Sequence, residues 1–429
     1  MRFQSIKVHA WRQFRDVQIQ LHPKLTVLTG PNGSGKSTLL SLFSRCMENS
    51  SIEPFLATPI RDRKTGVSRY SLRTVNRSAK KHIDENEAIV NSEVIGEITL
   101  NSGTVANLRV DDNNRLQYEV FVEGPTNVPG FMIGSHRAQP RYQEVKVLPV
   151  SGISPNEALQ YFFQSQRHYF RGDMYRRDGR SITNPVAPLK ETLIGFAAFG
   201  EDNKNMKAVP ELVGLFDKFQ DILRKVLPTE IGFQRLEVRS PEIIIVSKTG
   251  DFPLDSASGG LMSIIQTTWQ IFLFENANTA DSVVLMDEPE NHLHPSLQRD
   301  FLSNIVATFS NIQFIVATHS PFIVSSVKES SIYALRYVDA DENGYFSGGA
   351  VSAQLISREG LAGTASKVLD EILGVPITIP VWAETELTAI TQKFQSSDLT
   401  QASIDTLRNE LKKAGLSEFF PEAIGRLAQ

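Results

Sequence analysis

Short apolar runs alternate with polar or glycine-rich stretches along the first 50 residues. The spacing predicts strands at 6–9, 17–21 and 25–29. A glycine-rich stretch, 30–35, follows the third strand, and the periodic apolar positions after it predict a helix from 36 to about 47. This order of strand, loop and helix is the setting that a phosphate-binding loop requires.

The pattern changes several times in the middle of the chain. Residues 50–90 are polar and basic with few periodic apolar positions, which indicates a long loop. Alternating apolar positions between Val94 and Val122, interrupted by turn residues, predict an antiparallel meander. Two helices are expected next, at 154–170, where the chain opens with a capping box, and at 210–226.

Strands of the fully buried type return in the second half. We expect them at 243–246, 283–286 and 314–317, with an apolar helix ending near Phe274 and another helix from 295 to about 309. Apolar strands that alternate with helices are typical of a parallel sheet. The tail beyond Ser347 is predicted to be mostly helical, with candidate helices at 366–373, 384–394 and 404–414.

Composition narrows the class of protein. The chain has 429 residues, of which 41% are hydrophobic and 21% charged, enough for a sizeable core in two or three units. No run approaches the roughly 18 apolar residues of a membrane span, and the chain start reads as a strand, so we expect a cytoplasmic protein that does not bind membranes. The single cysteine, Cys46, excludes an internal disulfide and a multi-cysteine zinc site.

Charge is unevenly distributed although the net charge is only −4. A basic surface for nucleic acid is one interpretation, and a solvated face is the other. The basic residues gather in two segments: Arg61, Arg63, Lys64, Arg69, Arg73, Arg77, Lys80 and Lys81, with Asp62 as the single acid among them; and Arg167, Arg171, Arg176, Arg177 and Arg180.

The glycine-rich stretch and the start of its helix match G-x-x-x-x-G-K-[ST], in which backbone N–H groups converge on phosphates. Lys36 would reach the β and γ phosphates of ATP, and Ser37 would ligate Mg²⁺. The predicted ATP-binding residues are Asn32, Gly33, Ser34, Gly35, Lys36, Ser37 and Thr38.

Two later strands end in residues that suit hydrolysis. The strand at 283–286 runs into Asp287, which can hold Mg²⁺ through water, and Glu288, which can act as general base. The strand at 314–317 leads to His319, which can contact the γ-phosphate or the attacking water if the two strands are neighbours.

The segment 256–260, Ser-Ala-Ser-Gly-Gly, precedes the apolar helix. It offers a hydroxyl, exposed backbone amides and a helix N-terminus, which together bind anions. An ordinary capped helix start explains the same residues equally directly.

The order of phosphate loop, Ser-Gly-Gly helix, Asp-Glu strand and strand-His resembles the head of ABC-type ATPases, in the branch of the SMC, RecF and OLD proteins. Phe14 lies between two strands as in that branch, and the segment 288–295, Glu-Pro-Glu-Asn-His-Leu-His-Pro, resembles its extension of the Asp-Glu strand. The resemblance covers roughly residues 1–50 and 230–340.

The resemblance implies an α/β fold: a mixed or parallel sheet with flanking helices, an inserted α+β region and a helical C-terminal tail. The expected divisions are 1–50, the N-terminal part of the ATPase with the phosphate loop; 51–230, an insertion with the basic loop, the meander and helices; 231–346, the C-terminal part of the ATPase; and 347–429, the helical region.

The resemblance also implies a head-to-head dimer that sandwiches two ATP molecules and hydrolyses them at composite sites. Ser258, Gly259 and Gly260 match the signature that contacts the ATP of the other copy, whereas the flanking Ala257 and Leu261 depart from it. For the Mg²⁺-contacting glutamine of the family the candidates are Gln139 and Gln143.

The motifs that this sequence lacks distinguish among the members of this branch. The sequence has no Cys-x-x-Cys hook and no long heptad run, and Asp339-Ala340-Asp341-Glu342 reads as a hairpin turn, so no nuclease motif is predicted. The short helical tail resembles the PtuA ATPases of Septu-type and retron-associated antiphage systems. That resemblance implies an ATPase that senses and regulates a separate HNH nuclease, with a retron reverse transcriptase and its noncoding DNA as further candidate partners.

Two other function classes remain open. A RecF-like or SMC-like ATPase that clamps or repairs DNA would use the basic segments. The ATPase subunit of a membrane transporter is disfavoured by the insertion and by the 290–295 segment.

Overall fold

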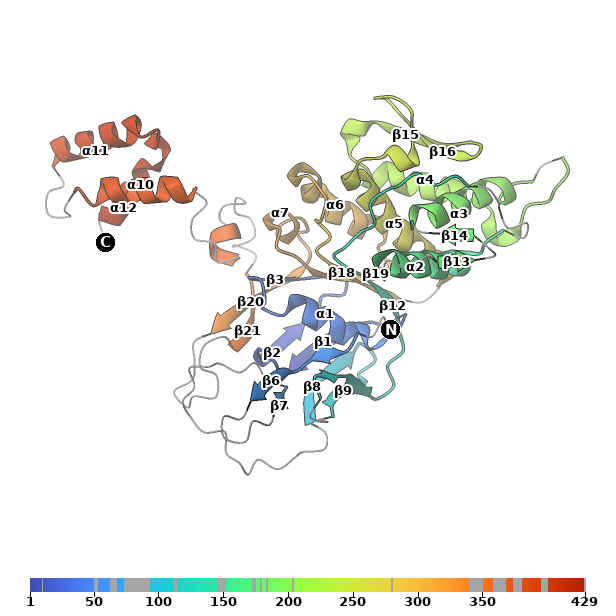
Figure 1. Cartoon of the computed structure of the whole chain (residues 1–429), viewed down its shortest axis with the longest axis horizontal. Helices are drawn as coiled ribbons and strands as arrows, with labels where there is room; N and C mark the ends of the chain where they lie inside the picture. Colours follow the sequence, from blue (N-terminus) through green and yellow to red (C-terminus); the bar gives the residue numbers. More distant parts are fainter. Residues whose placement is uncertain are drawn as a thin grey trace. The chain divides into compact units, whose positions relative to one another are not determined.

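The chain divides into a large unit, Met1–Val368 with Ile372–Gly374, and a small unit, Leu369–Glu371 with Val375–Gln429. Figure 1 shows the computed structural model. The structure describes residues 1–9, 11–49, 53–61, 68–72, 93–111, 115–145, 148, 152–171, 175–177, 180–182, 184–202, 204–278, 281–338, 350–357, 368–372, 380–394 and 400–427.

A sheet of twelve strands organises the large unit, in the order β11-β9-β8-β1-β2-β21-β20-β3-β19-β18-β12-β4. Its second half is parallel from β20 to β4. Every residue of β3, β18 and β19 is buried, as expected for strands covered on both faces. The parallel strands are β3 (Leu25–Thr29), β4 (Met47–Asn49), β12 (Val128–Ile133), β18 (Ser282–Asp287), β19 (Ile312–Ala317) and β20 (Ser331–Val338).

The other half of the sheet is antiparallel from β11 to β2. Strand β2 then pairs parallel with β21, and β21 pairs antiparallel with β20 of the parallel half. The strands of this other half are β1 (Phe3–Val8), β2 (Phe14–Gln20), β8 (Glu93–Leu100), β9 (Val105–Val110), β11 (Val120–Glu123) and β21 (Ala350–Leu355). Strands β8, β9, β11 and β12 all come from the segment 51–230, so this segment forms one end of the sheet and also places β12 between β18 and β4.

Strand β21 lies in the tail that the sequence pattern predicts to be mostly helical. Its residues, Ala-Val-Ser-Ala-Gln-Leu, contain few strongly apolar side chains. Pairing with β20 on one side and β2 on the other determines its conformation, because strand formation depends more on neighbours than on local propensity.

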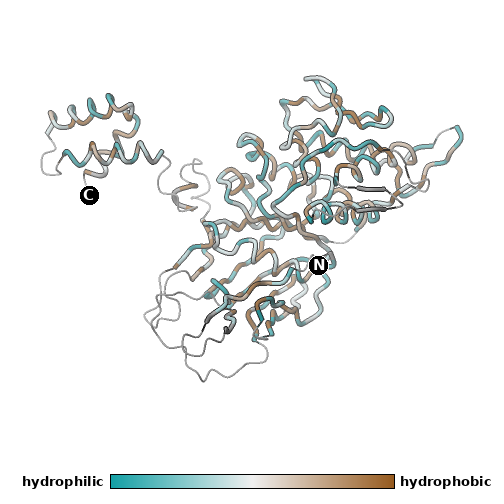
Figure 2. Tube along the Cα trace, viewed as in Figure 1, coloured by the Kyte–Doolittle hydropathy of each residue, from teal (hydrophilic) through white to brown (hydrophobic). Residues whose placement is uncertain are grey.

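Two hydrophobic cores cover the two faces of the parallel strands. Along β18, Val284 and Met286 belong to one core, and Val283 and Leu285 belong to the other. Successive side chains of a strand point to opposite faces, so the sheet is buried from both sides. The first core holds helices α2 to α6 and the second holds α1 with the antiparallel strands. Figure 2 shows that hydrophobic stretches, in brown, run through the middle of the large unit.

The helices of the large unit are α1 (Lys36–Ser44), α2 (Pro155–Arg171), α3 (Val186–Phe199), α4 (Leu215–Val226), α5 (Gly259–Ala277), α6 (Pro295–Thr308) and α7 (Pro321–Val324). Short 3-10 turns lie at Pro210–Leu212, Thr229–Ile231 and Leu254–Ser256, and a π-helical turn at Val368–Ile372. The smaller sheets consist of β15 (Phe233–Arg239), β16 (Glu242–Ser247) and β17 (Phe252–Pro253); β5 (Phe55–Leu56) with β10 (Gln117–Tyr118); β6 (Thr58–Arg61) with β7 (Ser68–Ser71); and β13 (Tyr175–Arg177) with β14 (Arg180–Ile182).

The small unit is helical and has a core of its own. It contains α10 (Val381–Thr391), α11 (Gln401–Lys413), a 3-10 turn at Ser417–Phe419 and α12 (Phe420–Leu427). Leu387, Leu407 and Leu411 are buried against one another in this core. Over the described residues of both units, no helix combines the length and the apolar character that crossing a membrane would need.

Helix α3 carries a buried lysine that joins three segments of the large unit. The side chain of Lys190 is 0% exposed and its Nζ donates to Glu242 Oε2 and Asp255 Oδ2, each at 2.5 Å, and to the carbonyl of Gln143 at 3.0 Å. Asp255 lies just before the segment 256–260. The lysine therefore fixes the chain that leads into α5.

We expect Lys190→Met to lower the free energy of unfolding by about 3 to 5 kcal/mol, because the substitution leaves two carboxylates without their cation. Denaturant unfolding followed by circular dichroism would measure the change. Lys218→Met is the control, since the ion pair of Lys218 with Glu275 is half exposed and its loss should cost about 1 kcal/mol or less. Equal stability of the two variants would contradict this role.

Candidate nucleotide-binding site

The glycine-rich loop connects β3 to α1 at the carboxyl end of the parallel strands. Gly33 and Gly35 have φ values of 77° and 97°, a region that disfavours other residues. A Cβ atom on Gly35 would lie 2.4 Å from Cζ of Phe14. Within the described ranges no side chain caps the start of α1, so its first backbone N–H groups are available to an anion.

Lys36 is folded into this loop. Its Nζ donates to the carbonyl oxygens of Gly30 and Pro31 at 3.0 and 3.1 Å, and the residue is 6% exposed. Burial lowers the pKa of Lys36 to about 8, opposed by the nearby carboxylates, of which Asp287 acts most strongly. Phosphate oxygens would give this buried cation the charged partner that the two carbonyls do not supply.

The order of the sheet brings the predicted carboxylates to the loop. β18 lies between β19 and β12, with β3 next to β19, and all four run parallel. Asp287 ends β18, and its Oδ1 accepts a hydrogen bond from Ser37 Oγ at 3.0 Å. Burial raises the pKa of Asp287.

The pair Ser37 and Asp287 suits Mg²⁺. A hydroxyl and a carboxylate oxygen are ligands that Mg²⁺ prefers, and Mg²⁺ usually takes one or two carboxylates and completes its shell with water and substrate phosphates. Among the described residues, no group of three or more His, Cys, Asp or Glu side chains could hold a metal by itself. The protein thus offers a partial ligand set of the kind that a nucleotide completes.

Glu288 follows directly and has an unusual backbone. Its φ is 46°, in the left-handed region. Its N–H donates to the carbonyl of Ala317 at 2.8 Å, and its Oε2 accepts from Asn291 Nδ2 at 2.8 Å. A left-handed backbone is unfavourable for a residue other than glycine, so it persists only where the surrounding contacts hold it. Such residues cluster at functional sites.

His319 lies in the turn after the adjacent strand, β19. The carboxylate of Glu290 holds this turn by hydrogen bonds. Glu290 Oε1 accepts from Thr318 Oγ1 at 2.6 Å and from the N–H groups of His319 and Ser320 at 2.9 and 3.2 Å. Burial, helped by the positive charge of Lys36, lowers the pKa of His319. The imidazole is therefore neutral at neutral pH and can accept or donate a hydrogen bond.

Most of the predicted ATP-site residues line one cavity of about 560 Å³. Ser34 is fully buried and Asp287 is reached through Ser37. The described residues that line the cavity are Arg12, Gln13, Asn32, Gly33, Gly35, Lys36, Ser37, Thr38, Glu288, His319 and Tyr337.

Three of these lining residues, Arg12, Gln13 and Tyr337, are not among those predicted from the sequence. Gln13 Nε2 donates to the carbonyl of Gly33 at 3.4 Å, and the hydroxyl of Tyr337 donates to the carbonyl of Asn32 at 3.2 Å. Arg12 has a φ of 52°, and its guanidinium lies over the rings of Trp11 and Phe55. No sequence motif predicts these roles. Only Phe14, next to Arg12 and Gln13, marks this part of the chain in the resemblance described above.

The signature segment lies at the start of α5 and outside this lining. Ser258 caps the helix by accepting from the N–H of Leu261 at 3.3 Å. A Cβ atom on Gly259 would lie 3.1 Å from Gln139 Oε1, and one on Gly260 would lie 2.9 Å from the carbonyl of His292. Gln139 is thus beside α5, and the described residues that line the cavity include neither Gln139 nor Gln143.

Several sequence predictions fall on residues that the structure does not describe. The turn Asp339 to Glu342 lies outside the described residues, as does most of the basic segment 61–81. Arg167 and Arg171 lie on α2, whereas only the backbone of Arg176, Arg177 and Arg180 is described.

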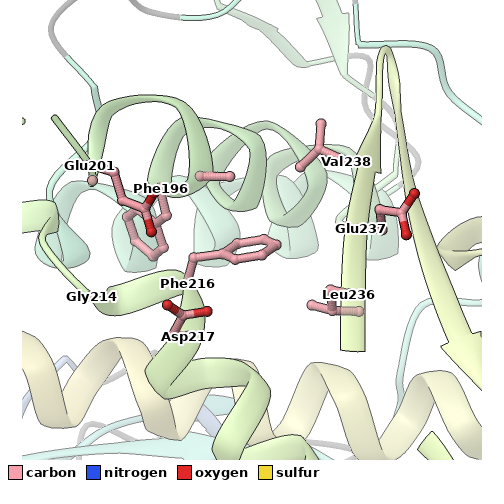
Figure 3. Close-up of a pocket in the computed structure, with 10 residues that line it drawn as sticks. Phe196, Glu201, Gly214, Phe216, Asp217, Leu236, Glu237 and Val238 are labelled. Atoms are coloured by element: carbon pink, nitrogen blue, oxygen red, sulfur yellow. The ribbon is translucent and has the colours of Figure 1, made fainter. Parts of the chain in front are cut away.

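A second cavity, of about 350 Å³, lies among α3, α4 and β15 (Figure 3). Phe196 and Phe216 line it together with three carboxylates. Asp217 accepts from Gln220, and Glu237 is paired with Arg235 and Arg239. The described lining of this cavity contains no predicted site residue and no part of the phosphate loop. The candidate nucleotide site is therefore the cavity of about 560 Å³ beside the phosphate loop.

Two family models match the chain. Residues 5–118 match the description "AAA domain", and residues 163–325 match "AAA domain, putative AbiEii toxin, Type IV TA system". The two matches contain the phosphate loop and the Asp-Glu strand, respectively.

The chain is also similar to proteins of retron and Septu systems. The probable ATPase of retron Ec83 of Escherichia coli is 31% identical over 163 residues, which are 36% of this chain and 27% of the relative. The probable ATPase of retron Vc95 of Vibrio cholerae is 22% identical over 79% of this chain and 74% of the relative. The Septu protein PtuA of Bacillus mycoides is 27% identical over 36% of this chain and 21% of the relative.

The match therefore spans about a quarter of the Ec83 protein and about a fifth of PtuA. Among solved structures, the SMC head domain from Thermotoga maritima aligns with 83% of this chain and 100% of its own length, with a TM-score of 0.43 and 13% identity.

Proposed function

We propose that this chain, which is an ABC-type ATPase of the SMC, RecF and OLD branch related to retron and Septu ATPases, binds and hydrolyses ATP at a site shared by two copies. One observation carries the proposal. The Ser37–Asp287 pair, at 3.0 Å, joins the phosphate loop to the end of β18. Glu288, the next residue, lines one cavity together with His319.

In the proposed reaction, the loop N–H groups and Lys36 hold the triphosphate. Glu288 orients a water molecule and accepts its proton while the water oxygen bonds to the γ-phosphorus. The bond between that phosphorus and the bridging oxygen of ADP breaks, which releases phosphate. Mg²⁺, held by Ser37 and Asp287, would neutralise charge on the β and γ phosphates. His319, neutral in this environment, hydrogen-bonds the γ-phosphate or the water.

The second copy enters through the signature segment. Ser258, Gly259 and Gly260 begin α5, a helix of 19 residues whose N-terminus carries a hydroxyl and two glycines. A helix N-terminus of this kind suits the phosphates of a nucleotide, and these residues lie outside the lining of their own chain's cavity. We infer that they complete the cavity of the partner copy.

Mixing two inactive variants tests the shared site. Lys36→Ala removes the phosphate lysine and Ser258→Arg blocks the signature, so each pure variant should be inactive. A mixed dimer has one composite site with both defects and one with neither. With random exchange and independent sites, the equimolar mixture should recover about a quarter of the wild-type hydrolysis rate.

Native mass spectrometry of the mixture would verify that mixed dimers form. If they form and the rate does not recover, the signature does not act in the partner's site. A stable dimer in which Ser258→Arg alone is fully active would contradict the role of Ser258.

We further propose that the ATPase is a sensor and regulator in antiphage defence, and that a separate HNH nuclease acts beside it. The relatives named for retrons and Septu support this role. A retron reverse transcriptase with its noncoding DNA is a further candidate partner. A DNA clamp or repair ATPase is the alternative, favoured by the arginines on α2 and in the basic segments.

Copurification distinguishes these roles. A tagged Glu288→Gln chain, expressed from its native locus and purified in ATP and Mg²⁺, would be analysed by mass spectrometry. Stoichiometric recovery of a nuclease or reverse transcriptase would support the defence role. Recovery of DNA alone would favour the clamp, and salt-dependent binding lost on neutralising the basic residues would then confirm it.

A further inference from the structure

A buried arginine follows β12, the parallel neighbour of β18. Arg137 is 4% exposed. Its Nη1 donates to the carbonyl of Ser135 at 3.0 Å and to the carbonyl of Glu288 at 3.4 Å. Its Nε and Nη2 are buried and have no hydrogen-bond partner among the residues that the structure describes. A buried guanidinium with unsatisfied donors is costly, so its presence requires an explanation.

The charges around Arg137 are those of the candidate site. The carboxylates of Glu290, Asp287 and Glu288, in that order, act on it most strongly. Glu290 Oε2 is also buried, and it has no hydrogen-bond partner in the described part of the chain, while Glu290 Oε1 accepts from the N–H of His319. Arg137 is therefore a buried cation that balances the carboxylates at the end of β18 and in the turn that follows it.

Asn291 makes a second connection between the same two segments. Its Nδ2 donates to the carbonyl of Ser135 at 3.0 Å and to Glu288 Oε2 at 2.8 Å. Its backbone N–H donates to the carbonyl of Glu288 at 3.1 Å. Arg137 thus holds the main chain of Glu288 and Asn291 holds both its main chain and its carboxylate, with the Ser135 carbonyl as their common anchor.

We propose that Arg137 and Asn291 are positioning residues for hydrolysis, which together fix the left-handed backbone and the carboxylate direction of Glu288. This inference rests on the proposed function, because it assigns a role in the reaction of the same site. Hydrolysis requires the general base to lie within hydrogen-bond reach of the water, and a misplacement of about 1 Å can cost a hundredfold in rate. Arg137 donates to the main chain of Glu288 and Asn291 donates to its carboxylate, so both ends of the Glu288 side chain are held.

A double-mutant cycle tests the proposal. Arg137→Met and Asn291→Ala are each made in the wild-type chain and in Glu288→Gln, and the rate of ATP hydrolysis and the Kd of ATP are measured. In the wild-type chain we expect each to lower kcat about tenfold to hundredfold and to change Kd less than about threefold. In Glu288→Gln the same changes should lower the residual rate less than about twofold, because the base that they position is already absent.

Arg141→Met is the matched control, since Arg141 is exposed in the same segment and should leave kcat unchanged. Arg137→Lys keeps the charge but not the planar fork, so it should recover only part of the rate. Thermal unfolding identifies a variant that fails to fold. If Arg137→Met does so, Arg137→Lys and Asn291→Ala decide the question.

Equal losses in the two backgrounds, or a loss of ATP affinity as large as the loss of kcat, would overturn the inference and leave a structural role. A wild-type chain without ATP hydrolysis would instead defeat the proposed function. If the wild-type chain hydrolyses ATP and the Arg137 and Asn291 variants hydrolyse it at the same rate, this inference fails while the proposed function stands.

Discussion

Glu288→Gln is expected to lower kcat for ATP hydrolysis by about 10² to 10⁴, the usual contribution of general acid–base catalysis, while ATP still binds. Glutamine has nearly the shape of glutamate but cannot accept the proton of the attacking water. Lys36, Ser37 and Asp287 are unchanged, so the ground-state contacts to ATP and Mg²⁺ remain. The variant should therefore accumulate as an ATP-bound dimer, measured by multi-angle light scattering with and without ATP.

Glu329→Gln is the matched control, because the Glu329 side chain is 72% exposed and lies 3.9 Å from Lys24 in a loose ion pair. Its rate should equal that of the wild-type chain. Hydrolysis by Glu288→Gln at the wild-type rate would remove Glu288 from its role as base. A loss of ATP binding in Glu288→Gln would show that its charge serves binding.

Lys36→Ala is expected to weaken ATP binding by about a hundredfold or more, the size expected when one partner of a buried charged hydrogen bond is removed. The two carbonyl groups that now accept from Lys36 cannot hold phosphate. Calorimetric titration with ATP and Mg²⁺ would measure the Kd. Saturating ATP should raise the Tm of the wild-type chain and leave the Tm of Lys36→Ala unchanged, since a ligand stabilises only the state that binds it.

Lys24→Ala serves as control, because Lys24 is about half exposed at the start of β3 and should bind ATP as the wild-type chain does. The unfolding of Lys36→Ala without nucleotide should match that of the wild-type chain within about 1 kcal/mol, since the substitution removes a buried cation whose present partners are carbonyl groups. Undiminished affinity for ATP would contradict the assignment of the phosphate loop.

The sequence predicts those parts of the site that depend on local structure. The phosphate loop needs a strand, glycines and a helix that are contiguous. Asp287 ends one fully buried strand and His319 comes shortly after another. Parallel strands place their carboxyl ends at one edge of a sheet. These residues could therefore be predicted to meet without knowledge of the full strand order.

The parts that depend on the order of the strands could not be predicted. Arg137 reaches Glu288 only because β12, far away in the sequence, pairs with β18. Tyr337 reaches the loop because β20 pairs with β3, and Arg12 because β2 is joined to β20 through β21. None of these contacts follows from hydrophobic periodicity, which describes a strand's faces but not its neighbours.

The signature segment shows the same division. Its residue types and its position before an apolar helix are visible in the sequence, and Ser258 forms the expected cap. The contact of Gly260 with His292 is a tertiary feature, as is the hydrogen bond of 3.4 Å from Ser263 Oγ to the carbonyl of Asn291. Both tie the start of α5 to the turn that carries Glu288.

That tie has a consequence for the proposed dimer, in which each copy contributes to two sites. A nucleotide bound at the start of α5 in one copy would strengthen, within a single layer of contacts, the hold of Asn291 on the Glu288 of that copy's own site. Occupancy of one site would then be communicated to the other without movement of the sheet. We expect the rate to rise sigmoidally with ATP concentration, with a Hill coefficient above one, so that the ATPase responds to a threshold of ATP.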